Sequence, residues 1–171
     1  LDAGAATFMS AFNTINGVPA SGNKWLLNDV LRDEWGFKGF VVSDWNSLGE
    51  MLAHGNVESN YEIGLQGVEA GVDMDMEGRI YLTEVTKLLN NKMITIEQID
   101  EMVSRILRVK FQLGLFDDPY QYCDSKKQAE LTMHPDHLKA AREIAKKTFV
   151  LLKNEKQLLP LPKNGKKIAL I

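Results

Sequence analysis

Apolar and polar residues follow one another along this chain in blocks that predict alternating strands and helices. The most clearly bounded block is residues 39–43, Gly-Phe-Val-Val-Ser, where a short continuous apolar run lies between turn residues. Such a run is typical of a strand buried on both faces, as in a parallel sheet. Two further strands are predicted at residues 6–12 and 72–76, the second with strict alternation of apolar and acidic residues.

Residues that begin and end helices lie after each predicted strand. Ser59 with Glu62, and Thr95 with Gln98, have the spacing of a capping box. The order of elements, with short connections, predicts a parallel α/β arrangement that is either part of a barrel or part of an open sheet. We expect helices at residues 23–35, 59–70, 80–90, 95–113 and 135–147.

The segments between these elements are polar or rich in turn residues. Residues 13–23 and 45–58 are predicted to be loops, and the lapse of periodicity over 116–135 indicates a linker. Gly64 and Gly67 weaken the helix that contains them, so we expect them to allow close packing against a sheet.

Composition narrows the class of protein. The 171 residues are 44% hydrophobic and 25% charged, which is the balance of a globular domain. A net charge of -3 gives no basic surface for nucleic acid and no polybasic patch for a membrane. No apolar stretch approaches the roughly 20 residues that span a bilayer. The single cysteine, Cys123, excludes an internal disulfide and leaves the cellular compartment open.

The two ends of the chain indicate a longer polypeptide. Leu1 is followed by neither a basic nor a hydrophobic leader, and residues 166–171 are predicted to begin a strand. A half-sheet of this kind would leave open strand edges. We therefore expect the remainder of the same polypeptide to accompany this chain.

Asp44 and Trp45 come directly after the strand predicted at 39–43. In parallel α/β domains chemistry takes place at the carboxyl ends of strands, so Asp44 is the leading catalytic candidate. A carboxylate there can attack an electrophilic carbon and form a covalent intermediate, and an indole offers a face for a sugar ring. The alternative is that Asp44 caps the loop that follows, because one Asp after a strand is a weak signal.

The remaining candidates for chemistry are weaker. Asp73, Asp75 and Glu77 would point the same way on a strand, where they could hold Mg²⁺ or Ca²⁺. The alternative is that they form hydrogen bonds that order nearby loops. The three histidines match no nucleophile–base spacing, and the glycines match no dinucleotide or phosphate loop.

Five segments, taken in order, carry a resemblance to a known family. Residues 9–19 read Met-Ser-Ala-Phe-Asn-Thr-Ile-Asn-Gly-Val-Pro. The second segment, residues 27–45, contains Leu27, Val30, Leu31, Arg32 and Trp35 and then reads Gly-Phe-Lys-Gly-Phe-Val-Val-Ser-Asp-Trp. Residues 70–76 read Ala-Gly-Val-Asp-Met-Asp-Met, residues 114–120 read Gly-Leu-Phe-Asp-Asp-Pro-Tyr, and residues 151–161 contain Leu-Leu-Lys-Asn and Leu-Leu-Pro-Leu. Over nearly the whole chain these segments resemble glycoside hydrolase family 3, the β-glucosidases and β-xylosidases.

The resemblance implies an architecture. Residues 1–115 would form the last three βα units of a TIM-like (β/α)8 barrel, residues 116–135 a linker, and residues 136–171 the start of an α/β sandwich domain. The rest of the same polypeptide would close the barrel and supply the catalytic acid/base.

The resemblance also implies an activity. The expected function is retaining, exo-acting hydrolysis of β-glycosides, with β-glucosidase as the first expectation and with neither a cofactor nor a metal. Asp44 takes the place of the nucleophile, Trp45 that of the aromatic beside it, and Met9 and Phe12 line the same sugar subsite. The family commonly has Tyr where this chain has Phe12, so that contact would be van der Waals only. The alternative is a non-catalytic carbohydrate-binding protein on a hydrolase-like scaffold.

Overall fold

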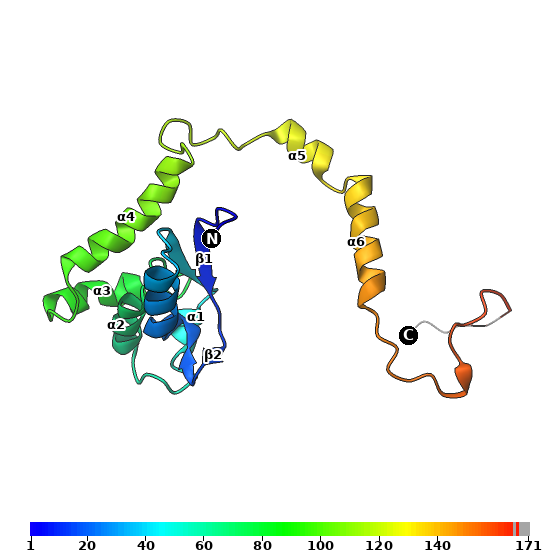
Figure 1. The fold of residues 1–171 in the computed structure, drawn as a ribbon, viewed down its shortest axis with the longest axis horizontal. Helices are drawn as coiled ribbons and strands as arrows, with labels where there is room; N and C mark the ends of the chain where they lie inside the picture. Colours follow the sequence, from blue (N-terminus) through cyan, green and yellow to red (C-terminus); the bar gives the residue numbers. More distant parts are fainter. Residues whose placement is uncertain (166, 168–171) are drawn as a thin grey trace. The chain divides into compact units, whose positions relative to one another are not determined.

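The computed structural model describes residues 1–165 and 167, and the chain divides into two compact units, Leu1–Gln121 and Tyr122–Ile171 (Figure 1). The strand that we expect at residues 166–171 lies outside the described residues, apart from Lys167. Among the described residues, no helix is both long and apolar enough to cross a membrane.

The centre of the first unit is a pair of parallel strands. β1 (Thr7–Ser10) pairs with β4 (Phe40–Ser43), so that Met9 lies opposite Val42 and Ser10 opposite Ser43. A single parallel bridge joins Val42 to Met74 on the segment that follows. The parallel pairing confirms the α/β class. β1 is shorter than the strand predicted at 6–12, and the segment predicted at 72–76 forms only this one bridge.

A small hairpin occupies part of the loop predicted at 13–23. β2 (Thr14–Ile15) and β3 (Val18–Pro19) pair in an antiparallel manner. Between them, Asn16 and Gly17 have φ angles of 53° and 82°. Two successive positive φ angles at Asn-Gly are those of a type I′ turn, whose twist matches that of the flanking strands.

Helices η2 (Trp25–Glu34), α2 (Asn60–Ala70), α3 (Ile80–Asn90) and α4 (Ile96–Gln112) confirm the four helices predicted in this unit. η2 is wound as a π-helix, and at its end the Trp35 N–H donates to the carbonyl of Val30, five residues back. The loop predicted at 45–58 contains one further short helix, α1 (Ser47–Glu50), so that prediction was wrong for these four residues.

The predicted capping boxes differ in outcome. Thr95 and Gln98 form the complete reciprocal box at the start of α4. At α2 the hydroxyl of Ser59 accepts from the Glu62 N–H, but the Glu62 carboxylate accepts from the Glu58 N–H at 2.8 Å. The α2 box therefore closes one residue earlier than predicted.

Gly64 and Gly67 allow α2 to lie against α3 rather than against a sheet, which corrects our expectation (Figure 1). A Cβ at Gly64 would lie 3.2 Å from both Glu84 Cβ and Leu88 Cδ1 on α3. A Cβ at Gly67 would lie 2.8 Å from the Tyr81 hydroxyl. Each distance is tighter than ordinary contact, so only glycine gives this spacing without a shift of the neighbours.

Over its described residues, the second unit holds two helices and a short turn. α6 (Pro135–Thr148) confirms the helix predicted at 135–147, and η3 (Glu155–Gln157) follows it. α5 (Ser125–Leu131) lies inside the predicted linker, where the Asp124 carboxylate accepts from two backbone N–H groups of its first turn. Asp124 is an N-cap residue, which is the signal that the prediction overlooked.

A buried carboxylate joins the layers of the first unit. The side chain of Asp73 is 0% exposed; its Oδ2 accepts from Arg32 Nη2 at 2.6 Å and from the Val41 N–H at 2.8 Å. Its Oδ1 accepts from Arg105 Nη1 at 2.8 Å. One side chain thus ties η2 and α4 to the beginning of β4.

Arg32 completes this cluster with backbone contacts. Its guanidinium also donates to the carbonyl oxygens of Gly39 and Gly71, each at 3.0 Å. Burial lowers the pKa of Arg32, and the charge of Asp73 opposes that shift. Within the described residues the Nε of Arg32 is buried without a hydrogen-bond partner, so the cluster holds a desolvated cation that depends on Asp73.

We expect Asp73→Asn to lower the free energy of unfolding of the full-length protein by about 3 kcal/mol, because the buried guanidinium of Arg32 loses its bonded counter-charge and the partly buried Arg105 keeps only that of Glu101. Denaturant unfolding measures this change. The matched control is Glu143→Gln, which removes the partner of Lys146 from an ion pair whose two side chains are 53% and 52% exposed. That control should cost no more than about 0.5 kcal/mol. Equal losses in the two variants would contradict the anchoring role of Asp73.

Candidate active site

Asp44 lies at the carboxyl ends of the two paired strands. Its N–H donates to the Ser10 carbonyl at 3.2 Å, which continues the pairing of β1 and β4 by one residue. Alternation along β4 places Asp44 on the same face as Val42, and the register places Met9 on that face too. Val41 points the other way, into the apolar core that the helices cover. Asp44 therefore stands at the strand end that the sequence predicts, on the face of the sheet opposite to Val41 and the apolar core.

The Asp44 carboxylate has one oxygen oriented and one available. Oδ1 accepts from the Trp45 N–H at 2.6 Å. Among the described residues, Oδ2 has no hydrogen-bond partner, and Asp44 is partly exposed. The Ser47 N–H donates to the Asp44 backbone carbonyl, not to the side chain. The capping alternative thus accounts for only one of the two carboxylate oxygens.

The backbone around Asp44 is held by the end of β4 and by the segment beside it. The Ser43 hydroxyl donates to the Asp44 carbonyl at 3.0 Å and accepts from the Met76 N–H at 2.8 Å. The Asn46 N–H donates to the Met76 carbonyl at 2.8 Å, with Asn46 at a φ of 55°. These bonds fix the turn that carries the carboxylate and the indole.

Three buried serines lie next to this turn. The hydroxyl oxygens of Ser10 and Ser21 are 2.8 Å apart, and those of Ser21 and Ser47 are 2.7 Å apart. All three residues are at most 4% exposed. Sequence reasoning missed them, because an isolated serine has no periodicity and no spacing that marks it.

The predicted sugar-contacting residues are exposed near the carboxyl ends of the strands. Met9, Phe12 and Trp45 are 57%, 37% and 62% exposed. Met9 belongs to β1, Phe12 lies between β1 and β2, and Trp45 precedes α1. Neither the Phe12 ring nor the indole stacks on another ring of the described residues. The large apolar faces are thus open to a ligand or to another segment of protein.

The acidic segment at 73–77 has a structural role, in line with the alternative to a metal site. Asp73 is buried with its two arginines. The Asp75 carboxylate accepts from the N–H groups of Gly78, Ile80 and Tyr81, and so caps α3. Glu77 is exposed. In the part of the chain that the structure describes, no group of three acidic, histidine or cysteine side chains is arranged to hold a metal.

A model of known families matches this chain. The glycosyl hydrolase family 3 N-terminal domain matches residues 1–109. This chain belongs to that family. The N-terminal domain of family 3 is of the TIM-barrel type, and the parallel pairing of β1, β4 and Met74 agrees with an α/β chain.

Relatives of this family 3 chain are glycosidases. It is 40% identical over 168 residues to the periplasmic β-glucosidase of Salmonella typhimurium, covering 96% of this chain and 22% of that protein. It is 43% identical over 169 residues to a putative β-xylosidase of Formosa agariphila, with coverage of 95% and 22%. The crystal structure of the Listeria innocua β-glucosidase is similar at a TM-score of 0.77 and 38% identity, covering 96% of this chain and 23% of that one. This chain therefore spans about a fifth of the length of these relatives.

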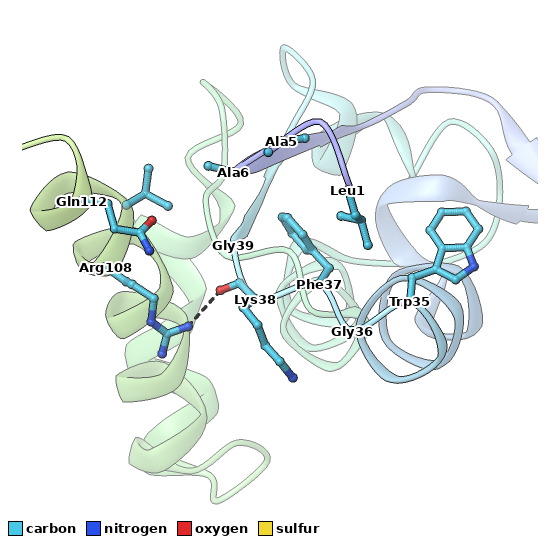
Figure 2. A pocket seen from close by; sticks show the side chains of 12 residues that line it. Leu1, Ala5, Ala6, Trp35, Gly36, Phe37, Lys38, Gly39, Arg108 and Gln112 are labelled. Atoms are coloured by element: carbon cyan, nitrogen blue, oxygen red, sulfur yellow. Dashed lines mark hydrogen bonds between the residues drawn. The ribbon is translucent and has the colours of Figure 1, made fainter.

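The cavity in Figure 2 lies at the other ends of the strands. Its lining includes Ala6, which precedes β1, and Gly39, which precedes β4, and its volume is about 310 Å³. From α4, Arg108 donates to the Lys38 carbonyl at 2.9 Å, as the dashed line shows (Figure 2). Because barrel chemistry takes place at the carboxyl ends, this cavity at the amino ends is not the candidate active site.

Tyr81 holds the segment at residues 72–76, which runs beside the end of β4. Its hydroxyl donates to the Val72 carbonyl at 2.7 Å. Burial raises the pKa of the Tyr81 phenol well above its usual value, and the charges of Asp75 and Asp73 raise it further. The phenol is therefore held neutral in the folded protein at pH values where an exposed tyrosine ionises.

Ionisation of Tyr81 should destabilise the protein in alkali. Since its folded-state pKa is raised, Tyr81 leaves stability unchanged below about pH 10, and stability falls as the pH rises from there through the raised pKa. The wild-type free energy of unfolding should fall by up to about 1.4 kcal/mol per pH unit more than that of Tyr81→Phe. Unfolding measured from pH 8 to 11 tests this. Tyr120→Phe, at an exposed position, should keep the wild-type slope.

Proposed function

We propose that this chain carries the nucleophile of a retaining, exo-acting β-glycosidase, and that Asp44 is that nucleophile. The observation that carries the proposal is the placement of Asp44 at the carboxyl ends of parallel strands, with Oδ2 unpaired among the described residues. Membership of family 3 and the names of the β-glucosidase and β-xylosidase relatives support the reaction class.

The proposed reaction has two steps. Asp44 Oδ2 attacks the anomeric carbon and forms an ester to the sugar, while the bond to the leaving oxygen breaks. An acid outside this segment protonates that oxygen. Water then attacks the anomeric carbon and loses a proton to the conjugate base of that acid. The ester bond breaks, and the Asp44 carboxylate is restored. In retaining glycosidases the two carboxyl groups are about 5–5.5 Å apart, so the partner must come close to Asp44.

The sugar would lie over the exposed apolar side chains at this end of the sheet. The Trp45 indole would stack against the C–H face of the ring, and Met9 and Phe12 would complete the same subsite. Phe12 has no hydroxyl, so its contribution would be van der Waals contact. β-Glucose is the first candidate, because the Listeria innocua β-glucosidase has been crystallised with glucose and with gluconolactone. The β-xylosidase relatives make xylose the second.

The complete protein would supply what this segment lacks. Residues 1–115 would be the last three βα units of the barrel, residues 116–135 the linker, and residues 136–171 the start of an α/β sandwich domain. β1 is an edge strand in the described sheet, and an unpaired edge would be covered by the preceding barrel strand. The oligosaccharide substrate, the acid/base and the rest of the barrel would therefore be partners of this segment, and we expect neither a nucleic-acid nor a membrane partner.

Asp44→Ala in the full-length enzyme should lower kcat for an aryl β-glucoside by more than about 10³-fold, because the covalent step is lost. Steady-state kinetics measure this loss. Asp100→Asn, at an exposed position on α4, is the matched control and should keep wild-type kcat. Normal turnover by Asp44→Ala would end the proposed role.

A trapping experiment separates an enzyme from a carbohydrate-binding protein. A 2-deoxy-2-fluoroglucoside traps the glycosyl-enzyme, and mass spectrometry of the digested protein locates the label. Label on Asp44 supports the nucleophile. Reversible binding of glucose without label or turnover would instead favour the non-catalytic alternative.

Trp45→Ala should weaken substrate binding by about 1 kcal/mol, or roughly five- to tenfold in KM, because the sugar loses its stacking face. The control is Trp25→Ala, which removes an indole that is 52% exposed on η2, compared with 62% for Trp45. Michaelis constants for the two variants decide the matter, and equal effects would argue against a subsite at Trp45.

A further inference from the structure

The three buried serines form part of a closed circuit of hydrogen bonds. The Asp44 N–H donates to the carbonyl of Ser10 at 3.2 Å. The hydroxyls of Ser10, Ser21 and Ser47 are then linked in series at 2.8 and 2.7 Å. The Ser47 N–H donates back to the Asp44 carbonyl at 3.0 Å. The circuit therefore begins and ends on the backbone of Asp44.

Each serine comes from a different element. Ser10 ends β1, Ser21 lies in the short helix η1 (Ala20–Gly22), and Ser47 begins α1. Ser21 is the link between the other two and is 1% exposed. Its only described side-chain hydrogen bonds are those to the other two serines. Among the described residues it makes no hydrogen bond to the Asp44 carboxylate, and it is too buried to form part of the exposed face on which a sugar would lie.

We propose that Ser21 is a positioning residue for Asp44, and that it acts through Ser10 and Ser47 as one cooperative unit. The proposal rests on the proposed function of Asp44 as the nucleophile. The position of a carboxylate directly after a strand depends on how firmly the N–H and carbonyl groups of its own residue are held. The circuit fixes both of them, the N–H through the end of β1 and the carbonyl through the start of α1.

Loss of the middle hydroxyl should loosen the turn without removing any group that touches the sugar. Two buried hydroxyls would then lack a partner, and their elements would shift to satisfy them. A misplacement of 1 Å at a reacting group can cost about 10²-fold in rate, so a shift of a few tenths of an ångström should cost about tenfold. Because the reacting oxygen is displaced rather than the sugar subsite, kcat should fall and KM should change little.

The test uses the full-length enzyme with single and double variants. Ser21→Ala should lower kcat about tenfold, with KM within about twofold of wild type, and Ser21→Thr, which keeps a hydroxyl, should recover most of the loss. Ser47→Ala breaks the same circuit at another bond. The kcat of the double variant Ser21→Ala with Ser47→Ala should lie within about twofold of that of the slower single variant, because each single variant already breaks the circuit. If Ser21→Ala does not fold, two other proteins are measured in the same way. They are the single variant Ser47→Ala and the double variant that combines Ser21→Thr with Ser47→Ala.

Thr95→Ala is the control for a general loss of stability. It removes a hydroxyl that caps α4, so it should lower the melting temperature while leaving kcat unchanged. A fall in melting temperature for Ser21→Ala with wild-type kcat would overturn the proposal. So would single effects that multiply to about a hundredfold in the double variant, since that marks independent residues.

Labelling by the 2-deoxy-2-fluoroglucoside keeps the two proposals apart. Label on Asp44 in Ser21→Ala, together with reduced kcat, supports both. Label on Asp44 with unchanged kcat overturns only the role of Ser21. Label on another residue of the wild-type enzyme overturns the role of Asp44, and the positioning proposal falls with it.

Discussion

The buried carboxylate of Asp73 is the interaction on which the first unit depends. A two-stranded sheet with one further bridge has few backbone hydrogen bonds to hold its layers. Asp73 adds ionic bonds from η2 and α4 and a hydrogen bond from the Val41 N–H. Such a cluster stabilises only when every charge is paired, since a buried ion without a counter-charge costs several kcal/mol. Because Asp73 is bonded to η2, α4 and β4, all three elements must be in place before these charges are paired.

This anchor and the candidate nucleophile lie at opposite ends of one short strand. Asp73 holds Val41 near the beginning of β4, and Asp44 follows its last residue. Three residues of strand span about 10 Å. Groups that far apart with no shared partner contribute to stability almost independently. The amino end of β4 can therefore carry a strong ionic cluster while the carboxyl end keeps a partly exposed carboxylate, which is the division of roles typical of barrels.

Local patterns predicted the elements well, and long-range partners escaped them. The strand at 39–43, α3 and the Thr95–Gln98 box follow from signals within a few residues, and so would the Asn-Gly hairpin, which we overlooked. The partners of Asp73 are 41 and 32 positions away, at Arg32 and Arg105, and no local pattern connects them. At the site, the position of Asp44 at a strand end was predictable. Its serine circuit was not, and its catalytic role stays a prediction.

The two ends of β4 also use different chemistry to hold an aspartate, and the difference suits their roles. Asp73 is held by two arginine side chains, whose guanidinium groups donate to both of its carboxylate oxygens. The circuit at the other end holds Asp44 by its backbone, through neutral hydroxyls and peptide groups. A neutral support of this kind adds rigidity without placing a competing charge beside the carboxylate. It leaves Oδ2 of Asp44 without a hydrogen-bond partner among the described residues, whereas arginines cover both carboxylate oxygens of Asp73.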